Sequence, residues 1–161
     1  MADVFMRFEK KYLLYADVFQ NIKKELSRYM EPDVYMKNGE PYDMLSLYYD
    51  TQDAHLIRTS MQKPRYKEKL RIRAYGTPQK EDTVYVEIKK KVDGQGNKRR
   101  SAMPLPAAYR FLQTGILPAA EPHMNLQVLK EIQGMLKHLQ LQPAMMIFCK
   151  RIAYSCKDDV K

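Results

Sequence analysis

Basic side chains recur at every second position in one segment of the chain and at part of such positions in a second. In segment 66–75 these positions hold Lys67, Lys69, Arg71 and Arg73. In segment 84–92 the alternate positions hold Tyr85, Glu87, Lys89 and Lys91. Because side chains alternate between the two faces of a β-strand, each set lies on one face if the segments are strands. Arg and Lys form charge-assisted hydrogen bonds with phosphate oxygens, so the pattern predicts a polyanion site.

Two other segments add charged residues to the pattern. Arg7, Glu9 and Lys11 share a face if 5–15 is a strand, and Lys98-Arg99-Arg100 opens a further strand. A half-buried antiparallel sheet with a charged face in water is the plainer interpretation. One observation argues against this interpretation: the cations recur on neighbouring strands, so the electrostatic repulsion among them accumulates. If the strands instead close into a barrel, the charged side chains can point inward, and Glu9 and Glu87 can hold a divalent cation there.

The elements that position these residues follow from periodicity and turn residues. We expect strands at 5–15, 44–51, 66–75, 84–92, 97–103 and 144–156, and helices at 17–30, 52–61, 104–113 and 125–140. Asp17 is the expected N-cap of the first helix. Segments 66–75, 84–92 and 97–103 are expected to form two successive hairpins. The predicted fold class is α+β.

Bulk properties are typical of one domain with an anionic partner. The chain has 161 residues and a formal net charge of +9, which favours nucleic acid, a phosphorylated molecule or an acidic membrane surface. No apolar run reaches the length of a membrane span, and the first residues lack the order of a signal peptide. Cys149 and Cys156 fall on opposite faces of the expected last strand. A cytoplasmic, reducing location is therefore predicted.

Six motifs, in this order, resemble a known family. They are Arg-Phe-Glu-Lys-Lys-Tyr (7–12), Ser-Leu-Tyr-Tyr-Asp-Thr (46–51), Lys-Leu-Arg-Ile-Arg-Ala-Tyr (69–75), Val-Glu-Ile-Lys-Lys-Lys (86–91), Lys-Arg-Arg (98–100) and Lys-Arg-Ile-Ala-Tyr (150–154). Over nearly its whole length the chain resembles the VTC domain, the polyphosphate polymerase domain of the vacuolar transporter chaperone family, in its bacterial stand-alone form. That domain is one of the triphosphate tunnel metalloenzymes, alongside the CYTH proteins. The resemblance implies an antiparallel barrel of about eight strands around a tunnel.

The resemblance also implies roles for individual residues. Arg71, Arg73 and Lys11 would form the electrostatic clamp on the triphosphate, with Lys89 on the neighbouring strand. Further phosphate contacts are implied for either Arg99 or Arg100, and for Arg151. Together with the strand faces, the predicted phosphate-binding set is Lys11, Lys69, Arg71, Arg73, Lys89, Lys91, Arg99, Arg100 and Arg151.

Two departures from the family pattern concern the metal and the end of the chain. Arg7 stands where the CYTH first-strand motif has a Glu, which resembles the polymerase branch. The family continues past Lys161 with strands that carry its main metal-binding Glu. We therefore expect residues 1–161 to form a single tunnel domain that lacks its last strands, with Glu9 and Glu87 as weak ligands for Mn²⁺ or Mg²⁺ and this fragment inactive.

The implied reaction is transfer of the γ-phosphoryl of ATP to a polyphosphate chain, by positioning and charge neutralisation. One alternative is hydrolysis of triphosphate or polyphosphate. Another is a catalytically silent module that binds polyphosphate or inositol phosphates. A nucleic-acid binder requires aromatic residues interleaved on the basic faces, for which Tyr75 and Tyr85 are the candidates. A membrane-protein partner and the oligomeric state stay open.

Overall fold

The structure, a computed structural model, describes residues 4–6, 10–33, 36 and 40–157. The chain divides into two compact units. Unit 1 contains Met1–Phe8 and Met44–Cys149, and unit 2 contains Glu9–Asp43 and Lys150–Lys161. Each unit is described by itself below.

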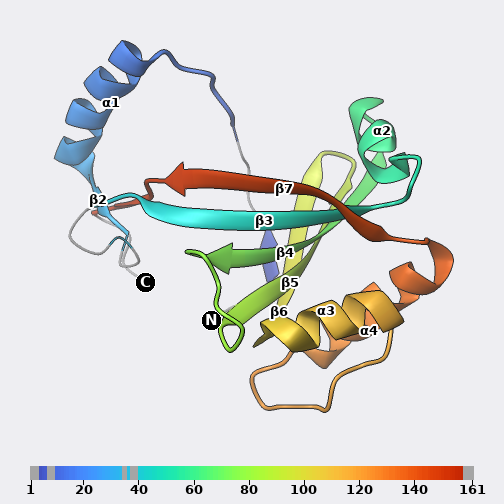
Figure 1. The fold of residues 1–161 in the computed structure, drawn as a ribbon. Helices are drawn as coiled ribbons and strands as arrows, with labels where there is room; N and C mark the ends of the chain where they lie inside the picture. Colours follow the sequence, from blue (N-terminus) through green and yellow to red (C-terminus); the bar gives the residue numbers. More distant parts are fainter. Residues whose placement is uncertain (1–3, 7–9, 34–35, 37–39, 158–161) are drawn as a thin grey trace. The chain divides into compact units, whose positions relative to one another are not determined.

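Unit 1 is built on a six-stranded sheet (Figure 1). In spatial order its strands are β1 (Val4–Met6), β6 (Gln95–Pro104), β5 (Thr83–Val92), β4 (Tyr66–Tyr75), β3 (Tyr42–Asp50) and β7 (Gln142–Arg151). The pairs β1–β6, β6–β5, β5–β4 and β4–β3 are antiparallel. An antiparallel sheet with flanking helices confirms the predicted α+β class. Within the described residues the sheet is open, with β1 and β7 as its edges.

The two predicted hairpins are confirmed, and local sequence explains the second of them. Strands β5 and β6 pair from Thr83 opposite Pro104 to Val92 opposite Gln95. The two residues between them, Asp93 and Gly94, both have positive φ, 46° and 89°. Asp-Gly suits such a two-residue turn because neither residue resists that backbone conformation strongly. The turn therefore sets which residues of β5 and β6 face each other.

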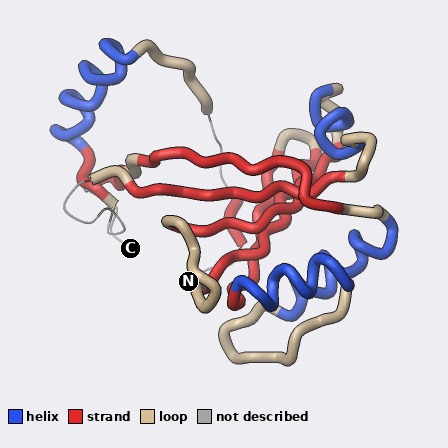
Figure 2. Tube along the Cα trace, viewed as in Figure 1, coloured by secondary structure: helices blue, strands red, loops and turns tan. Residues whose placement is uncertain are grey.

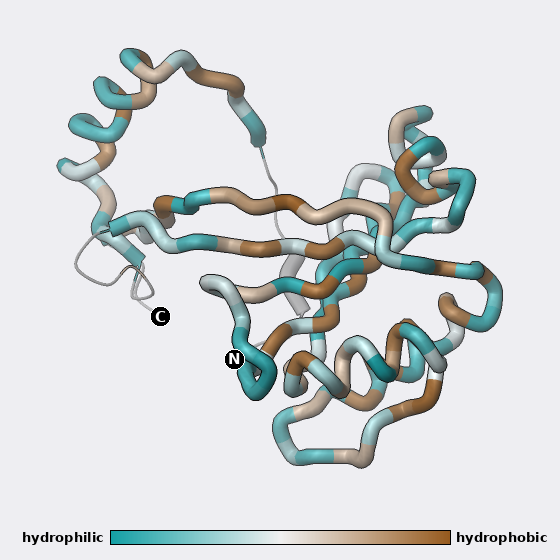
Figure 3. Tube along the Cα trace, viewed as in Figure 1, coloured by the Kyte–Doolittle hydropathy of each residue, from teal (hydrophilic) through white to brown (hydrophobic). Residues whose placement is uncertain are grey.

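One face of the sheet is apolar and is covered by helices. Its side chains include Leu70, Ile72, Val84, Val86, Ile88 and Met103, all nearly inaccessible to water. They share one core with Phe111 and Leu112 of α3 (Leu105–Thr114) and with Val128, Leu129 and Ile132 of α4 (Leu126–His138). Figure 2 shows these helices beside the strands, and Figure 3 shows hydrophobic and hydrophilic residues alternating along the central strands. Burying each large aliphatic side chain contributes about 1.5–3 kcal/mol, so this face holds the unit together.

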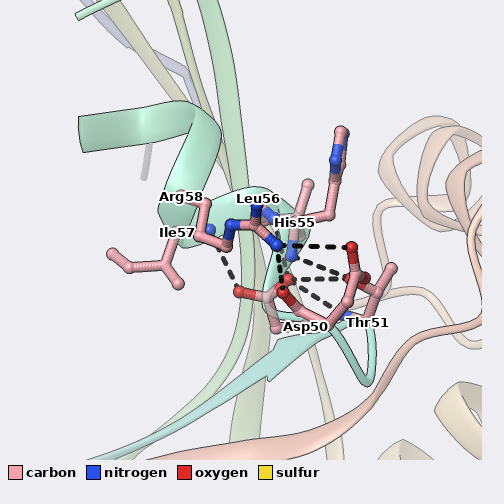
Figure 4. Close-up of polar contacts among 7 residues, drawn as sticks. Asp50, Thr51, His55, Leu56, Ile57 and Arg58 are labelled. Atoms are coloured by element: carbon pink, nitrogen blue, oxygen red, sulfur yellow. Dashed lines mark hydrogen bonds and ion pairs between the residues drawn. The ribbon is translucent and has the colours of Figure 1, made fainter. Parts of the chain in front are cut away.

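The short helix α2 (His55–Met61) begins on a carboxylate from the preceding strand (Figure 4). Asp50 is 6% exposed, and its Oδ1 accepts hydrogen bonds from the backbone N–H groups of Thr51 and Leu56 at 2.8 Å. Its Oδ2 accepts one from Ile57 N at 3.0 Å. The first N–H groups of a helix have no hydrogen-bond acceptor within the helix, and the carboxylate of Asp50 provides acceptors for them.

Unit 2 contains helix α1 (Ala16–Tyr29) and a two-stranded sheet of β2 (Met30–Pro32) and β8 (Tyr154–Cys156). The helix ends beside Lys157, whose Nζ donates to the carbonyl oxygens of Ser27 and Arg28 at 3.0 and 3.2 Å. A lysine in this position offsets the negative end of the helix dipole. Within the described residues, no helix of either unit has the length and apolar character of a membrane span.

Two predicted elements differ from the structure at the start of the chain. The strand predicted over 5–15 is short: β1 ends at Met6, residues 7–9 lie outside the described residues, and 10–15 are irregular and exposed. Tyr12, Leu13, Leu14 and Tyr15 are consecutive apolar residues without the period of two that a half-buried strand needs. The predicted cap Asp17 instead lies in the first turn, because the helix begins one residue earlier.

The last predicted strand, 144–156, is two strands in the structure. Strand β7 ends at Arg151 and β8 starts at Tyr154. Between them, the N–H of Ala153 donates to the Met36 sulfur at 3.1 Å, and its carbonyl oxygen accepts from Asp33 N at 2.9 Å. These backbone groups bond outside the sheet ladder, so the strand is interrupted there.

Candidate functional site

The sheet face opposite the core carries the predicted basic residues in rows that cross the strands. The central row reads Tyr48, Arg71, Glu87 and Arg100 on β3, β4, β5 and β6. One neighbouring row reads Ser46, Arg73, Tyr85 and Ala102, and the other contains Lys69, Lys89 and Lys98. We call these three rows the basic face. Side chains directly opposite each other in a sheet are in contact, so the cations are neighbours across strands as well as along them.

Glu87 lies at the centre of the basic face. Its side chain is 1% exposed, and Oε2 lies 2.6 Å from Arg71 Nη2 and accepts a hydrogen bond from Arg71 Nε at 2.8 Å. Arg73 Nε lies 3.9 Å from the same oxygen, and Lys98 Nζ lies 3.3 Å from Oε1. Three cations from two different strands therefore converge on one buried carboxylate.

The charges of this cluster do not balance. Arg71, Arg73 and Lys98 carry +3 and Glu87 carries −1, which leaves +2 among side chains that are 22% exposed or less. Arg73 Nε is buried and forms no hydrogen bond within the described part of the chain. Burial and the charge of Arg71 lower the pKa of Arg73, and burial lowers the pKa of Lys98 despite Glu87. Among the described residues of the cluster, the three cations therefore carry more positive charge than the carboxylate of Glu87 neutralises.

The pKa of Glu87 shows that its carboxylate stays ionised. Burial by itself raises this pKa, but the charges of Arg71, Lys98 and Arg73 and the hydrogen bond from Arg71 together lower it below its ordinary value. The cluster is therefore an ionised group with excess positive charge at neutral pH, as an anion site requires.

Tyrosines orient two of the arginines. The Tyr48 hydroxyl accepts a hydrogen bond from Arg71 Nη1 at 2.8 Å, so Arg71 is held on both sides, by Tyr48 and by Glu87. The Arg100 guanidinium carbon lies 4.4 Å from the centre of the Tyr85 ring, and Tyr75 packs edge-on against Tyr85. Stacking of this kind limits the orientation of a guanidinium group while its edge can still donate hydrogen bonds.

The structure separates the two arginines between which the sequence could not choose. Arg100 belongs to the basic face, opposite Glu87. Arg99 lies on the core side, where its Nη2 is 2.9 Å from Glu131 of α4 and Lys90 Nζ is 2.6 Å from the same carboxylate. Consecutive residues of a strand point to opposite faces, which explains the separation.

Other predicted residues lie elsewhere or outside the described residues. Lys89 and Lys91 are exposed on β5, and Lys69 on β4 is partly buried. Lys11 is exposed in an irregular stretch, and Arg151 is the last residue of β7; both belong to unit 2, so their place in the site stays a prediction. Glu9 lies outside the described residues.

Sequence reasoning missed two residues of the basic face, Lys98 and Tyr48. Lys98 stands two positions before Arg100. Both lie within the predicted strand 97–103, so strand periodicity alone places them on the same face. Tyr48 required the register of β3 against β4, which places it opposite Arg71. Both were within the quoted motifs but had no assigned role.

The described residues do not fit a divalent metal ion. They contain no group of three or more His, Cys, Asp or Glu side chains placed to bind one. Glu87, one of the two predicted ligands, is surrounded by cations that repel a metal ion and occupy its oxygens. Mn²⁺ and Mg²⁺ prefer several oxygen ligands, which the basic face does not provide.

A separate pocket of about 400 Å³ lies on the core side between α2, α4 and the sheet. Its lining includes two carboxylates, Glu68 and Glu131, which lie 3.8 and 2.6 Å from Lys90 Nζ. Lys67 also lines the pocket, so two carboxylates and two lysines are present and their charges sum to zero.

Comparison with known proteins gives a family and a fold. A family model described as "VTC domain" matches residues 6–161. The crystal structure of a "putative adenylate cyclase" from Bacillus halodurans is similar with a TM-score of 0.62 and 17% sequence identity, covering 98% of this chain and 71% of that one. No functionally curated protein matches the sequence. At this identity the crystal structure shows a shared fold and nothing about activity.

Proposed function

Because the chain belongs to the VTC domain family, we propose that its basic face binds the phosphates of triphosphate or polyphosphate. The observation that carries the proposal is the convergence of three cations, Arg71, Arg73 and Lys98, on the single buried carboxylate of Glu87. A chain of adjacent phosphates supplies closely spaced negative charge, and each oxygen accepts charge-assisted hydrogen bonds from guanidinium and ammonium groups. The nearby Lys69, Lys89 and Arg100 extend the face along such a chain.

We further propose that the reaction is phosphoryl transfer to polyphosphate. A terminal oxygen of the acceptor chain attacks the γ-phosphorus of ATP, a new P–O bond forms, and the bond to the β–γ bridging oxygen breaks to release ADP. No protein nucleophile takes part. Arg71 and Arg73 hold phosphate oxygens and offset the charge that shifts during transfer, which is how most enzymes of this reaction class act. The family also implies Mn²⁺ or Mg²⁺, but no step assigned to these residues runs through a metal.

A single substitution tests the binding proposal. Arg73→Met keeps the aliphatic stem and removes the charge that lacks a full partner. We expect the affinity for inorganic tripolyphosphate to fall about tenfold or more, because a charge-assisted hydrogen bond contributes about 1.5–3 kcal/mol. We also expect the melting temperature without ligand to stay equal or rise, because Arg73 is charged in the folded protein at a cost. Titration calorimetry and thermal unfolding measure the two effects.

The matched control is Arg71→Met, which removes the same charge from a well-paired position. Its melting temperature should fall, since the variant leaves Glu87 without the arginine that contacts its Oε2 through two nitrogens. If Arg73→Met binds tripolyphosphate as well as the unmodified protein does, the basic face is not the phosphate site.

Incubation of the protein with labelled ATP and Mn²⁺ separates the two candidate activities. Long labelled chains indicate a polymerase, and free phosphate indicates a hydrolase. Cytoplasmic location remains part of the same proposal.

A further inference from the structure

The contacts of Glu87 differ from those of a metal ligand. Each of its oxygens faces a cation: Oε2 faces Arg71 and Arg73, and Oε1 faces Lys98. At 1% exposure the carboxylate has almost no contact with water. It is thus the anion around which the cluster is arranged in the absence of any ligand.

Arg71 shows how this carboxylate competes with a bound phosphate. Its Nε and Nη2 are directed to Glu87 and its Nη1 to Tyr48. The bidentate edge of Arg71, with which a guanidinium group best binds a phosphate, is therefore taken by Glu87. Arg73 is held less closely: its Nε lies 3.9 Å from Glu87 Oε2 and forms no hydrogen bond among the described residues, so Arg73 is more available to a ligand than Arg71 is.

We propose that Glu87 is a built-in counter-ion. Without polyphosphate, its charge stabilises the folded protein by offsetting the repulsion among the clustered cations. With polyphosphate, the same negative charge lowers the binding affinity. The proposal rests on the proposed function and assigns Glu87 as a positioning residue. A site that must release or advance a chain of phosphates needs moderate affinity, and a fixed negative charge inside the cation cluster keeps the affinity moderate. The role predicted from sequence, metal ligation, is replaced by charge balance.

Glu87→Gln tests this role, because the amide keeps an oxygen acceptor for Arg71 and loses the charge. Without ligand, the local charge rises from +2 to +3, with Arg71, Arg73 and Lys98 left unneutralised. We expect the melting temperature to fall by roughly 3 °C or more. In EDTA, the affinity for inorganic tripolyphosphate should rise about threefold or more, so that the ligand raises the melting temperature further than in the unmodified protein.

Glu131→Gln is the matched control, since Glu131 is also a little-exposed carboxylate between two cations, Lys90 and Arg99, but on the core side. We expect it to lower the melting temperature while the tripolyphosphate affinity stays within twofold. A purely structural role of Glu87 would give the same result for both variants, and that outcome overturns the proposal. Loss of affinity in Glu87→Gln also overturns it; if the loss occurs only with Mn²⁺ present, Glu87 is a metal ligand.

A second variant covers the case in which Glu87→Gln does not fold. Glu87→Gln with Lys98→Gln removes one negative and one positive charge, so the cluster returns to +2 from Arg71 and Arg73 alone. Recovery of folding and of part of the melting temperature supports charge balance, and its absence contradicts it. If no form of the protein binds tripolyphosphate, the proposed function fails, while the melting temperatures still decide whether Glu87 is the counter-ion.

Discussion

At the scale of single residues, the site is defined by which charges are paired and which are not. Each guanidinium nitrogen of Arg71 contacts Glu87 or Tyr48, whereas Arg73 Nε has no hydrogen bond among the described residues. A buried guanidinium group with only a distant ion pair costs stability, and such groups are frequent at functional sites. Arg73 is therefore more informative about function than the number of basic residues is.

The neighbours Arg99 and Arg100 provide a prediction at this scale. Arg100→Ala should weaken tripolyphosphate binding about tenfold, because it removes a cation from the basic face. Arg99→Ala should leave the affinity within about twofold and lower the melting temperature, because Glu131 loses one of its two cations. Calorimetry and thermal unfolding of the two variants measure this contrast. The reverse pattern would show that phosphate binds on the core side of β6.

At the scale of secondary structure, the start of α2 depends on one side chain. Asp50→Ala removes the acceptor for the N–H groups of Thr51, Leu56 and Ile57. We expect the free energy of unfolding to fall by about 1–3 kcal/mol, since buried donors are left without partners. Urea denaturation measures the loss. Asp53 is an exposed carboxylate in the same turn, so Asp53→Ala should change the free energy of unfolding much less than Asp50→Ala does.

Strand periodicity predicted the central strands well, because burial of one sheet face requires an apolar residue at every second position. Segment 66–75 is β4 with the predicted bounds, and its apolar alternate residues form the core. The strand predicted over 5–15 was wrong for 10–15, where apolar residues are consecutive. The break at 152–153 was missed because it depends on Met36, which is far away in the chain. Sequence placed Glu87 on the same strand face as Lys89, but could not show that Arg71, Arg73 and Lys98 surround it, because the register brings these cations together.

At the scale of the whole molecule, a net charge of +9 attracts any polyanion. Specificity must come from the spacing of the cations, and those around Glu87 all reach a single carboxylate. Adjacent phosphates of a triphosphate match this density better than the phosphates of a nucleic acid, which are separated by a nucleoside. Tyr85, a candidate for base stacking, is already stacked on Arg100.

This comparison gives a prediction about partners. At about 150 mM NaCl, tripolyphosphate should bind at least tenfold more tightly than a single-stranded oligonucleotide of equal phosphate concentration, because binding that depends only on net charge is strongly weakened by salt. Competition with a fluorescent oligonucleotide, repeated over a range of salt concentrations, measures the difference. Equal affinities, or stronger binding of the oligonucleotide, would favour a nucleic-acid protein instead.

The Asp93-Gly94 turn has a consequence for how such a site evolves. A strand read one position out of step presents the opposite set of side chains to each surface. If the register of β6 moved by one residue with a change in this turn, Arg99 would replace Arg100 on the basic face, and Ser101 and Met103 would leave the interior for that face. The length of this surface turn is therefore constrained together with the residues of the basic face, although no atom of the turn needs to contact a phosphate.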